Sequence, residues 1–396
     1  MSLAEPARGL PAAEALEVWR AACADAGCPR RTGTEVRPLA DAVGRVSAEP
    51  VLALRSSPSF TSAAMDGIAV HAAETAEGAV LTDFVVIDTG DPLPDGYDAV
   101  VMREYVTITD GKAEVSVAAR VNQHVRRIGE DIATGEQLLP AGHRLRPFDV
   151  AAAAAAGHEN LTVHQAPRVT VIPTGDEIRP IGTDLQPGEI LDTNSLMLAA
   201  QARELGALAR ITDVVPDDPE QLLAAVLSAA ATADLVVLIA GSSAGREDHT
   251  AAVVGRAGRC AVHGVAVRPG HPVVLGVAGS GSTGTPVLGA PGYPVSAALT
   301  FEIFAAPLLA GLQGTTPPVR ACVTARLSLN VPSAVAGEDW IRVRLDEDGD
   351  ELVATPMDRR AGVLTSLVHA DGLLVVPAGV AGHAAGECVQ VRLLSS

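Results

Sequence analysis

Residues 235–250 read LVVLIAGSSAGREDHT, an apolar run followed by a loop of small residues, two carboxylates and a histidine. A short apolar run that ends at glycine is typical of a buried strand. The flanking sequence alternates strand-like and helix-like segments from residue 168 onward, namely RVTVIP, NSLMLAAQARELG, ARITDVV, DPEQLLAAVLSAAAT and HTAAVVGRAG. This alternation predicts βαβ units, and therefore an α/β domain with a largely parallel sheet.

The rest of the chain has different patterns of residue types. Residues 12–27 predict a helix from their Ala, Leu and Glu content, and VRPLADAVGRVSA (36–48) predicts a second one. Residues 50–142 are short β-branched segments separated by turn residues, whereas RPFDVAAAAAAGHENL (146–161) predicts a helix again. After a long apolar helix ending near Gly311, two-residue alternation predicts a small β-barrel or sandwich.

Composition limits the classes of function. The chain has 396 residues, so two to four domains are expected, and its net charge of −18 argues against nucleic acid or an anionic membrane as partners. The N-terminal stretch lacks a continuous apolar core, and no run of about 18 apolar residues occurs, so we expect a soluble, cytoplasmic protein. Five scattered cysteines without metal-ligand spacing predict reduced thiols and no zinc site.

Three loops follow predicted strands at the edge of the sheet where ligands of α/β proteins bind: PTGDEI (173–178), GSSAGREDHT (241–250) and PGYPVSA (291–297). Their small side chains allow backbone N–H groups to approach a phosphate, and each loop is expected to lead into a helix N-terminus. The residues most suited to hold a phosphate are Ser242, Ser243 and Gly245.

Glu177 and Asp248 stand in two of these loops and oppose an anion. A helix N-terminus favours an anion by about 0.3 to 1 kcal/mol, whereas two unit negative charges about 4 Å apart repel by about 4 kcal/mol at an effective dielectric of 20. A phosphate can share the site only with a cation, and Mg²⁺ suits one or two carboxylates plus phosphate oxygens. The alternative stays open that Asp176 and Asp248 are helix N-caps that need no ligand.

Further turn-forming stretches occur at AMDGIAV (64–70), DTGDPLPDGYDAVV and GEDIATGEQLLPAGHRL. Taken singly, an Asp-Gly between apolar flanks predicts a β-hairpin, and the other two stretches are ordinary turns. Their order along the chain is more informative than any one of them.

Eight ordered blocks resemble the signature blocks of the MoeA and gephyrin E-domain family, the molybdopterin molybdenumtransferases. The blocks are FTSAAMDGIAV, TGDPLPDGYDAVVMRE, GEDIATGEQLLPAGHRL, PTGDEI, GEILDTNSLMLAA, GSSAGREDHT, VRPGHPVVLG and GAPGYPVSAALTFEIF. The resemblance runs from about residue 15 to the end of the chain. It implies a homodimer of four domains: a discontinuous helical domain (1–48 and 143–166), a β-rich inserted domain (49–142), a MogA-like α/β domain (167–313) and a C-terminal β-barrel (314–396).

The resemblance also implies a reaction. Members of the family use Mg²⁺ to cleave adenylylated molybdopterin, release AMP and insert molybdenum from molybdate, which forms the molybdenum cofactor. By position, Glu177 and Asp248 resemble the metal-binding acids, and Asp66, Thr89 and Asp131 resemble active-site residues of the inserted domain that reach the site across the dimer interface. The catalytic set is Asp66, Asp131, Glu177 and Asp248, and the substrate-binding set adds Thr89, Gly175, Ser242, Ser243, Gly245, Arg268, His271, Pro291, Pro294, Arg342 and Ser366.

Some positions depart from the family pattern. Gly241-Ser242-Ser243-Ala244 replaces Gly-Gly-Val-Ser, and Pro291-Gly292-Tyr293-Pro294 replaces Pro-Gly-Asn-Pro. Arg268 and His271 stand where lysine is common, and Glu338 stands where an arginine is often found, which leaves Arg342 and Ser366 as the expected molybdate contacts. The alternatives are a pterin-binding carrier or scaffold without turnover, and an insertase for tungstate. Other molybdenum cofactor biosynthesis proteins are expected partners.

Overall fold

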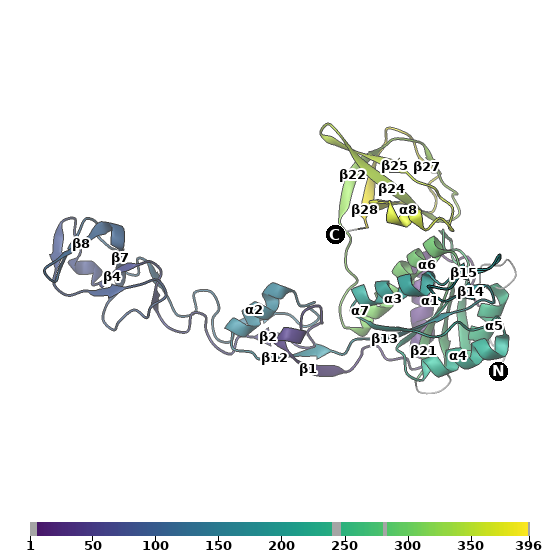
Figure 1. Cartoon of the computed structure of the whole chain (residues 1–396), viewed down its shortest axis with the longest axis horizontal. Helices are drawn as coiled ribbons and strands as arrows, with labels where there is room; N and C mark the ends of the chain where they lie inside the picture. Colours follow the sequence, from purple (N-terminus) through teal and green to yellow (C-terminus); the bar gives the residue numbers. More distant parts are fainter. Residues whose placement is uncertain (1–5, 240–246, 280–282, 395–396) are drawn as a thin grey trace. The chain divides into compact units, whose positions relative to one another are not determined.

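The computed structural model describes residues 6–239, 247–279 and 283–394, without the side chains of Glu247 and Asp248. The chain forms two compact units, Met1–Gly33 with His164–Ser396, and Thr34–Val163 (Figure 1). The larger unit contains the α/β sheet and the C-terminal barrel.

The α/β domain is built on a six-stranded sheet with the order β16-β13-β17-β21-β20-β18. The first four strands are parallel, and the last two are antiparallel to their neighbours, so the predicted largely parallel sheet is confirmed with an antiparallel edge. In that order the strands are Leu208–Ile211, Arg168–Pro173, Leu235–Ile239, Thr285–Ala290, Val274–Ala278 and Gly258–His263.

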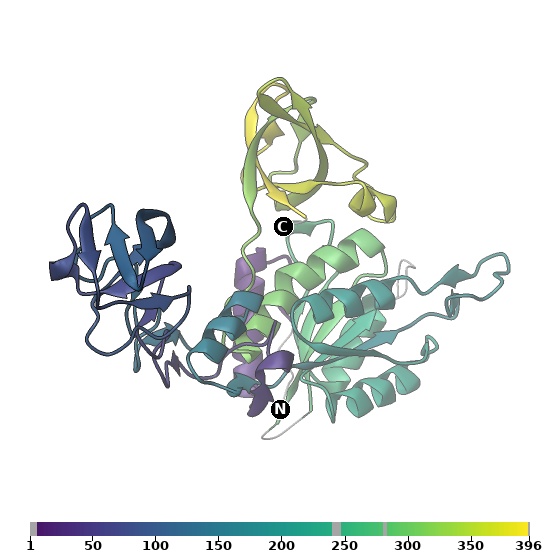
Figure 2. The ribbon, with the colours of Figure 1, turned by 60° about the vertical axis from the view of Figure 1, so that its left-hand side comes forward.

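Helices cover both faces of this sheet (Figure 2). Leu235 and Val237 point into one core and Val236 and Leu238 into the other, which explains why the opening stretch is apolar at every position. Asp218 caps one helix by accepting the backbone N–H groups of Glu220 and Gln221 in its first turn. The helices are α1 (Ala12–Asp25), α3 (Asn194–Glu204), α4 (Pro219–Ala230), α5 (Glu247–Ala257), α6 (Pro294–Thr300) and α7 (Ala306–Leu312), with the π-helical turn η4 (Phe301–Ala305) between the last two.

Helix α1 belongs to the α/β domain by its contacts. Its buried face contains Ala15, Trp19 and Ala22, and the Trp19 indole N–H donates to the carbonyl of Gly276 on β20 at 2.7 Å. The sequence-based division places this helix in the discontinuous helical domain, whereas its contacts lie within the unit Met1–Gly33 with His164–Ser396. The domain boundaries stay predictions.

The stretch Pro294–Leu312 is helical throughout, as expected for the long apolar helix. It is long and apolar enough to cross a membrane, with a mean hydropathy of 1.8, but 72% of it is buried in this unit. Its apolar character therefore reflects a place in the core.

The unit Thr34–Val163 contains the predicted β-rich region and the alanine-rich helix α2 (Pro147–Ala155). The second N-terminal helix was a wrong prediction. Residues 34–38 form β1, which pairs with β12 (Asn160–His164), and Leu39–Asp41 form only a short 3-10 turn. A long-range strand partner and Pro38, which lacks an N–H, outweigh the local helix propensity here.

Two three-stranded sheets form the inserted β region of this unit, with the orders β6-β4-β7 and β5-β9-β8. In chain order these strands are β4 (Gly67–Val70), β5 (Ala79–Leu81), β6 (Val85–Ile87), β7 (Ala99–Met102), β8 (Val106–Thr109) and β9 (Lys112–Val115). Short pairs add β2 (Val51–Leu52) with β11 (Gln137–Leu139) and β3 (Ser62–Ala63) with β10 (Val125–Arg126).

The C-terminal region is a closed five-stranded barrel, which decides between the barrel and the sandwich left open by the sequence. Closure follows because β24 pairs with both β25 and β26. Strands β24 and β25 are joined by a tight turn at Gly349 and Asp350, with Gly349 at φ +65°. The barrel strands are β22 (Cys322–Leu327), β24 (Glu338–Asp348), β25 (Glu351–Pro356), β26 (Gly372–Val376) and β28 (Cys388–Leu393), and a short helix α8 spans Thr365–Val368.

Candidate active site

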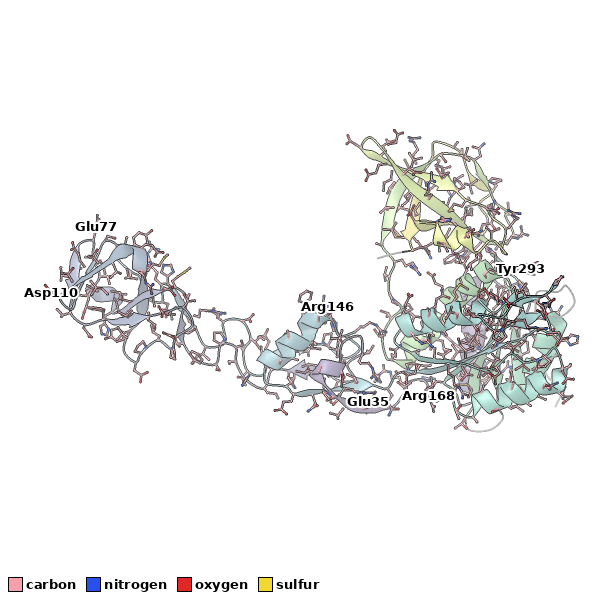
Figure 3. The ribbon with its side chains drawn as sticks, viewed as in Figure 1. Glu35, Glu77, Asp110, Arg146, Arg168 and Tyr293 are labelled. Atoms are coloured by element: carbon pink, nitrogen blue, oxygen red, sulfur yellow. The ribbon has the colours of Figure 1, made fainter. Side chains whose placement is uncertain are left out.

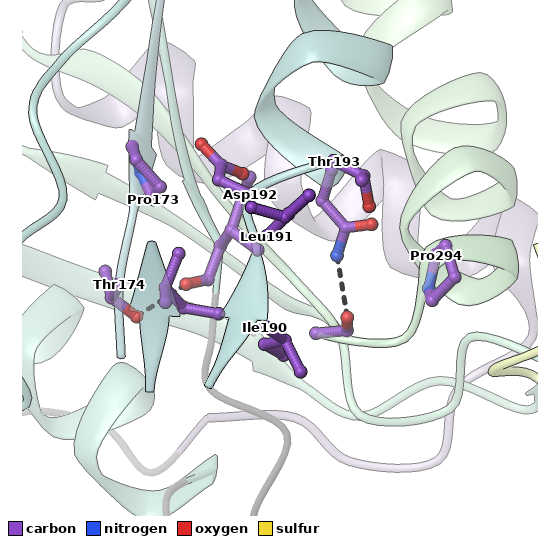
Figure 4. Close-up of a pocket in the computed structure, with 11 residues that line it drawn as sticks. Pro173, Thr174, Ile190, Leu191, Asp192, Thr193 and Pro294 are labelled. Atoms are coloured by element: carbon purple, nitrogen blue, oxygen red, sulfur yellow. Dashed lines mark hydrogen bonds between the residues drawn. The ribbon is translucent and has the colours of Figure 1, made fainter. Parts of the chain in front are cut away.

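A pocket of about 170 Å³ lies at the carboxyl ends of β13, β17 and β21 (Figure 4). This is the edge of the sheet at which the sequence predicted ligand binding. Its lining includes Thr174, Ile178, Asp192, Asn194 and Pro294. Three segments far apart in the chain therefore meet at one cavity.

The loop after β13 carries the first predicted acid. The Thr174 hydroxyl donates to the carbonyl of Ile239 on β17 at 2.6 Å, which ties this loop to the neighbouring strand. Gly175 has φ +139°, and a Cβ there would lie 2.9 Å from a carboxylate oxygen of Glu177. The half-buried Glu177 carboxylate therefore folds back over Gly175, a position that requires glycine.

The N-cap interpretation is wrong for Asp176. No helix begins at the loop 174–177; the chain enters β14 (Ile178–Arg179), which pairs with β15 (Ile190–Leu191). The carboxylates of Asp176 and Asp217 instead each accept the other residue's backbone N–H, at 3.2 and 3.3 Å. The expectation that every one of the three loops leads directly into a helix fails here for the same reason.

Asp248 follows the strand next to β13. It lies in the first turn of α5, because this helix includes Glu247 and Asp248 as its first described residues. The Asp248 side chain and the phosphate candidates Ser242, Ser243 and Gly245 lie outside the described residues. The two acidic loops nevertheless follow β13 and β17, which are adjacent and parallel.

Asp192 and Asn194 are polar residues of the pocket that were not predicted from the sequence. The Asp192 carboxylate accepts the backbone N–H of Ser195 at 3.1 Å and the Ser195 hydroxyl. The Asn194 amide donates to the carbonyl of Gly292 at 2.7 Å and so fixes the third loop (Figure 4). The available signal was the DTNS sequence within GEILDTNSLMLAA, where an Asp three residues before a Ser precedes an apolar helix.

The third loop supplies its second proline to the pocket. Pro294 is the first residue of α6 and lines the cavity, together with Gly292. Pro291 is buried directly after β21 and is not among the lining residues that the structure describes.

A second cavity of about 580 Å³ lies beside the barrel, where β19 (Val267–Arg268) pairs with β24. Its charged lining residues are Arg268, Arg342 and Arg359 together with Asp339, so its walls carry a net positive charge. The predicted contacts Arg342 and Ser366 lie together, because the Arg342 Nε donates to the Ser366 hydroxyl at 3.1 Å.

Arg342 is almost fully buried, with 1% of its surface exposed, and burial lowers its pKa. Its Nη2 donates to the carbonyls of Asp358 and Arg360, the latter at 3.2 Å. The Ser366 hydroxyl in turn donates to the carbonyl of Val363 at 2.6 Å. Both side chains thus hold the segment 358–366 in place, and Arg342 also reaches the cavity wall.

Arg359 is a cavity residue that the sequence analysis did not identify. Its guanidinium contacts the buried Asp339 at 2.8 Å and donates to the carbonyl of Pro332 at 2.6 Å. His271 is not among the described residues that line this cavity. Its Nδ1 lies 2.6 Å from the carbonyl oxygen of Val265. Glu338 accepts the indole N–H of Trp340 at 3.2 Å.

The unit Thr34–Val163 brings two predicted residues together. One Asp66 carboxylate oxygen accepts both the backbone N–H and the hydroxyl of Thr89, each at 2.7 Å, and these bonds lower the pKa of Asp66. Asp66-Gly67 does not form a hairpin, because β3 pairs with β10 and β4 pairs with β6 and β7. Asp131 is exposed on another segment, where its N–H donates to the carbonyl of Ser57.

No group of three or more His, Cys, Asp or Glu side chains is arranged to hold a metal within the part of the chain that the structure describes. A site made of Glu177 and Asp248 has only two protein ligands, and the Asp248 side chain lies outside the described part of the chain, so it would not form such a group. Phosphate oxygens of a substrate would have to complete it.

Three family models match the chain in order: MoeA N-terminal region (domain I and II) over residues 10–157, "Probable molybdopterin binding domain" over 170–311, and MoeA C-terminal region (domain IV) over 324–394. A molybdopterin molybdenumtransferase of Haemophilus influenzae is 30% identical over 389 residues, which cover 92% of this chain and 95% of that protein. The chain belongs to the MoeA family.

Other MoeA relatives support the same family assignment. The molybdopterin molybdenumtransferase 2 of Mycobacterium tuberculosis is 35% identical over 390 residues, which cover 89% of this chain and 93% of that protein. Two crystal structures titled as molybdopterin biosynthesis MoeA protein from Pyrococcus horikoshii match with TM-scores of 0.83 and 0.80 at 31% and 27% identity, each over 98% of this chain and 100% of the other. The MoeA fold predicted from the ordered blocks is therefore confirmed.

Proposed function

We propose that this MoeA-family protein acts in molybdenum cofactor biosynthesis as an insertase. It takes molybdenum from molybdate, places it on adenylylated molybdopterin and releases AMP, with Mg²⁺ as the metal. The observation that carries the proposal is the position of Glu177 in the loop after β13. Its carboxylate folds over Gly175, and the next residue, Ile178, lines the pocket of Thr174, Asp192 and Asn194. Curated relatives named molybdopterin molybdenumtransferase support the same activity.

The donors at this edge fit Mg²⁺. The loops that follow the adjacent parallel strands β13 and β17 leave the sheet at the same edge, and Mg²⁺ prefers hard oxygen ligands such as the carboxylates these loops carry in sequence. Glu177 and Asp248 would hold the ion, with phosphate oxygens of the substrate completing its shell. When bound, Mg²⁺ neutralises charge on the phosphoanhydride oxygens as the bond to AMP breaks.

The side chains of the pocket orient the pterin nucleotide. The Asn194 amide holds the loop at Gly292, and the Thr174 hydroxyl holds the exit of β13, so the walls are rigid before the substrate arrives. The Asp192 carboxylate accepts hydrogen bonds from the N–H and the hydroxyl of Ser195, and these bonds hold the start of α3 at the pocket wall. Rigid walls lower the entropic cost of positioning the reacting groups.

The cationic cavity of Arg268, Arg342 and Arg359 is the proposed entry site for the oxyanion. Guanidinium groups present paired N–H donors that match tetrahedral oxyanions. Asp66 and Asp131 would be supplied by a partner subunit in a homodimer, and Asp66, which is ionised at neutral pH, would position a water or a substrate hydroxyl. A cytoplasmic location and transfer of the product to other cofactor enzymes belong to the same proposal.

The test is an AMP-release assay with purified protein, adenylylated molybdopterin, Mg²⁺ and molybdate, beside an established family member as positive control. Wild type should release AMP and form cofactor, and Glu177→Gln should reduce the rate by about 100-fold or more, since it removes one metal-binding charge. Asp176→Asn is the matched control, because Asp176 is adjacent but pairs with the Asp217 backbone. Its rate should stay within about threefold of wild type.

Two results would count against the proposal. Absence of AMP release from wild type, under conditions in which the positive control turns over, would favour a carrier that binds the pterin nucleotide without turnover. Equal activity of Glu177→Gln and wild type would show that Glu177 is not the metal ligand that we propose. Molybdate and tungstate in competition would identify the preferred oxyanion in the same assay.

A further inference from the structure

Tyr293 has an unusual position for an aromatic residue in this protein. It lies directly between Gly292 and Pro294, which both line the pocket at the carboxyl edge of the sheet (Figure 3). Its side chain is 51% exposed, whereas Phe301 and Phe304, a few residues later in the same helical stretch, are buried in the core. Burial of apolar area therefore does not account for an aromatic ring at this position.

The ring is held from one side by the C-terminal region. A Cβ added at Gly362 would lie 3.4 and 3.5 Å from Cδ1 and Cε1 of Tyr293, so the ring lies against the backbone at this glycine. The N–H of Val295 donates to the carbonyl of Ala361 at 3.1 Å, which fixes the two segments to each other. The ring therefore has a defined position and remains open to solvent over about half of its surface.

The supporting segment is itself anchored. Arg342 donates to the carbonyls of Asp358 and Arg360, and Ser366 donates to that of Val363. Gly362 thus lies in a stretch whose backbone is held on both sides by buried side chains. None of the described hydrogen bonds uses the Tyr293 hydroxyl, so the ring face is the feature that this arrangement presents.

We propose that Tyr293 is a stacking platform for a planar nitrogen heterocycle of the pterin nucleotide, at the rim of the pocket. The inference rests on the proposed function, since that function supplies a ligand with two such rings, the pterin and the adenine. An aromatic side chain binds a flat heterocycle through its π face, and a ring that is already fixed loses little conformational entropy when it does so. Tyr293 is a substrate-positioning residue, and Gly362 positions Tyr293.

Fluorescence provides a direct test on the full-length protein. The two native tryptophans, Trp19 and Trp340, are 0% and 7% exposed, so a Tyr293→Trp variant adds an indole at the rim against a buried background. Pterin-6-carboxylate and AMP are titrated separately into this variant and into wild type. Quenching of the added emission by either compound supports the proposal and identifies which ring stacks; no added quenching by either overturns it.

Affinity measurements separate stacking from a purely structural role. Tyr293→Leu keeps an apolar contact with Gly362 but lacks a π face, so it should weaken binding of the quenching compound by about tenfold, with an unchanged melting temperature. Tyr293→Phe should bind within about twofold of wild type, because the ring is retained. Equal affinity of Tyr293→Leu and wild type, or a loss that only follows a lower melting temperature, would contradict the stacking role.

Gly362 offers a second variant pair that leaves Tyr293 intact. Gly362→Ala meets the ring at ordinary contact distance and should bind normally, whereas the larger side chain of Gly362→Val should displace the ring and weaken binding like Tyr293→Leu. The outcome is independent of turnover. Wild type that binds the probe but releases no AMP would refute the insertase and leave the stacking platform standing.

Discussion

The acidic side chains of this MoeA protein are held by different donors, and those donors decide how each carboxylate titrates. Asp66 is exposed, and its pKa is lowered by the N–H and hydroxyl of Thr89. Asp149, with 4% of its surface exposed, is buried at the start of α2 and accepts bonds from Arg146 and His143. The first arrangement leaves a charge available at the surface, whereas the second uses the charge for stability.

Asp149 should make the stability of its unit depend on pH. The Arg146 side chain, together with His143 and the Arg146 backbone N–H, holds the pKa of Asp149 well below its usual range. A lowered folded-state pKa means that the stabilisation is fully present above the unfolded value of about 4 and is lost as the pH falls through the folded value. Asp149→Asn should therefore lower the free energy of unfolding by about 2 kcal/mol at pH 7.

Urea unfolding of both proteins at pH 7 and at progressively lower pH measures this difference. The difference in stability should begin to narrow below about pH 4, where the carboxylate becomes protonated in the unfolded chain, and should disappear only as the pH falls through the lower folded-state pKa. A gap that is constant over this range would show that Asp149 acts through shape and not through charge.

At the scale of elements, amphipathic or fully buried segments were predictable and short ones were not. Strands β13 and β17 and helices α3 and α4 occur where the alternation placed them. Residues 36–48 have helix-like composition but form β1 and a 3-10 turn, because the partner strand β12 lies more than 100 residues later in the chain. The intrinsic helix or strand propensity of a segment does not depend on such a distant partner, and therefore cannot predict it.

Strand β4 shows how close packing can depend on one glycine. A Cβ on Gly67 would lie 1.9 Å from the carbonyl oxygen of Val101 on β7, so any side chain must separate the two strands. Gly67→Ala should destabilise the unit Thr34–Val163 by about 3 kcal/mol or more and disturb the neighbouring Asp66. Chemical denaturation measures the loss.

Gly311→Ala is the matched control for this substitution. Gly311 lies in α7 with nothing within 4 Å of its added Cβ, so alanine there should be neutral or stabilising by about 0.5 to 1 kcal/mol. If both alanine variants had the same stability, the steric account of Gly67 would be wrong.

At the scale of the whole molecule, the chain leaves apolar surface uncovered. In the unit Thr34–Val163, Val36, Leu54 and Phe148 are each more than 60% exposed. Apolar side chains that are exposed singly are common on protein surfaces, and they become informative only if one interface covers them. The homodimer expected from the family resemblance would give them a partner.

Sedimentation equilibrium should therefore yield about twice the chain mass of 40.4 kDa at micromolar concentration. Phe148→Glu places a charge on the most exposed of these residues and should shift the equilibrium toward monomer if that surface is buried in the dimer. A wild-type mass of one chain at every concentration tested would contradict the dimer, and with it the supply of Asp66 and Asp131 from a partner subunit.

The alternation of strands and helices determined the α/β domain and the carboxyl-edge position of Glu177, because strand periodicity and loop chemistry are local properties. The order of the blocks along the chain indicated the family. Tertiary structure alone decided that α1 joins the α/β sheet, that the C-terminal strands close into a barrel, and that Asp192, Asn194 and Arg359 face cavities. It also decided that Asp176 pairs with Asp217 and caps no helix. These outcomes depend on which distant segment supplies the hydrogen-bond donor or the packing surface, and spacing along one chain does not encode that choice.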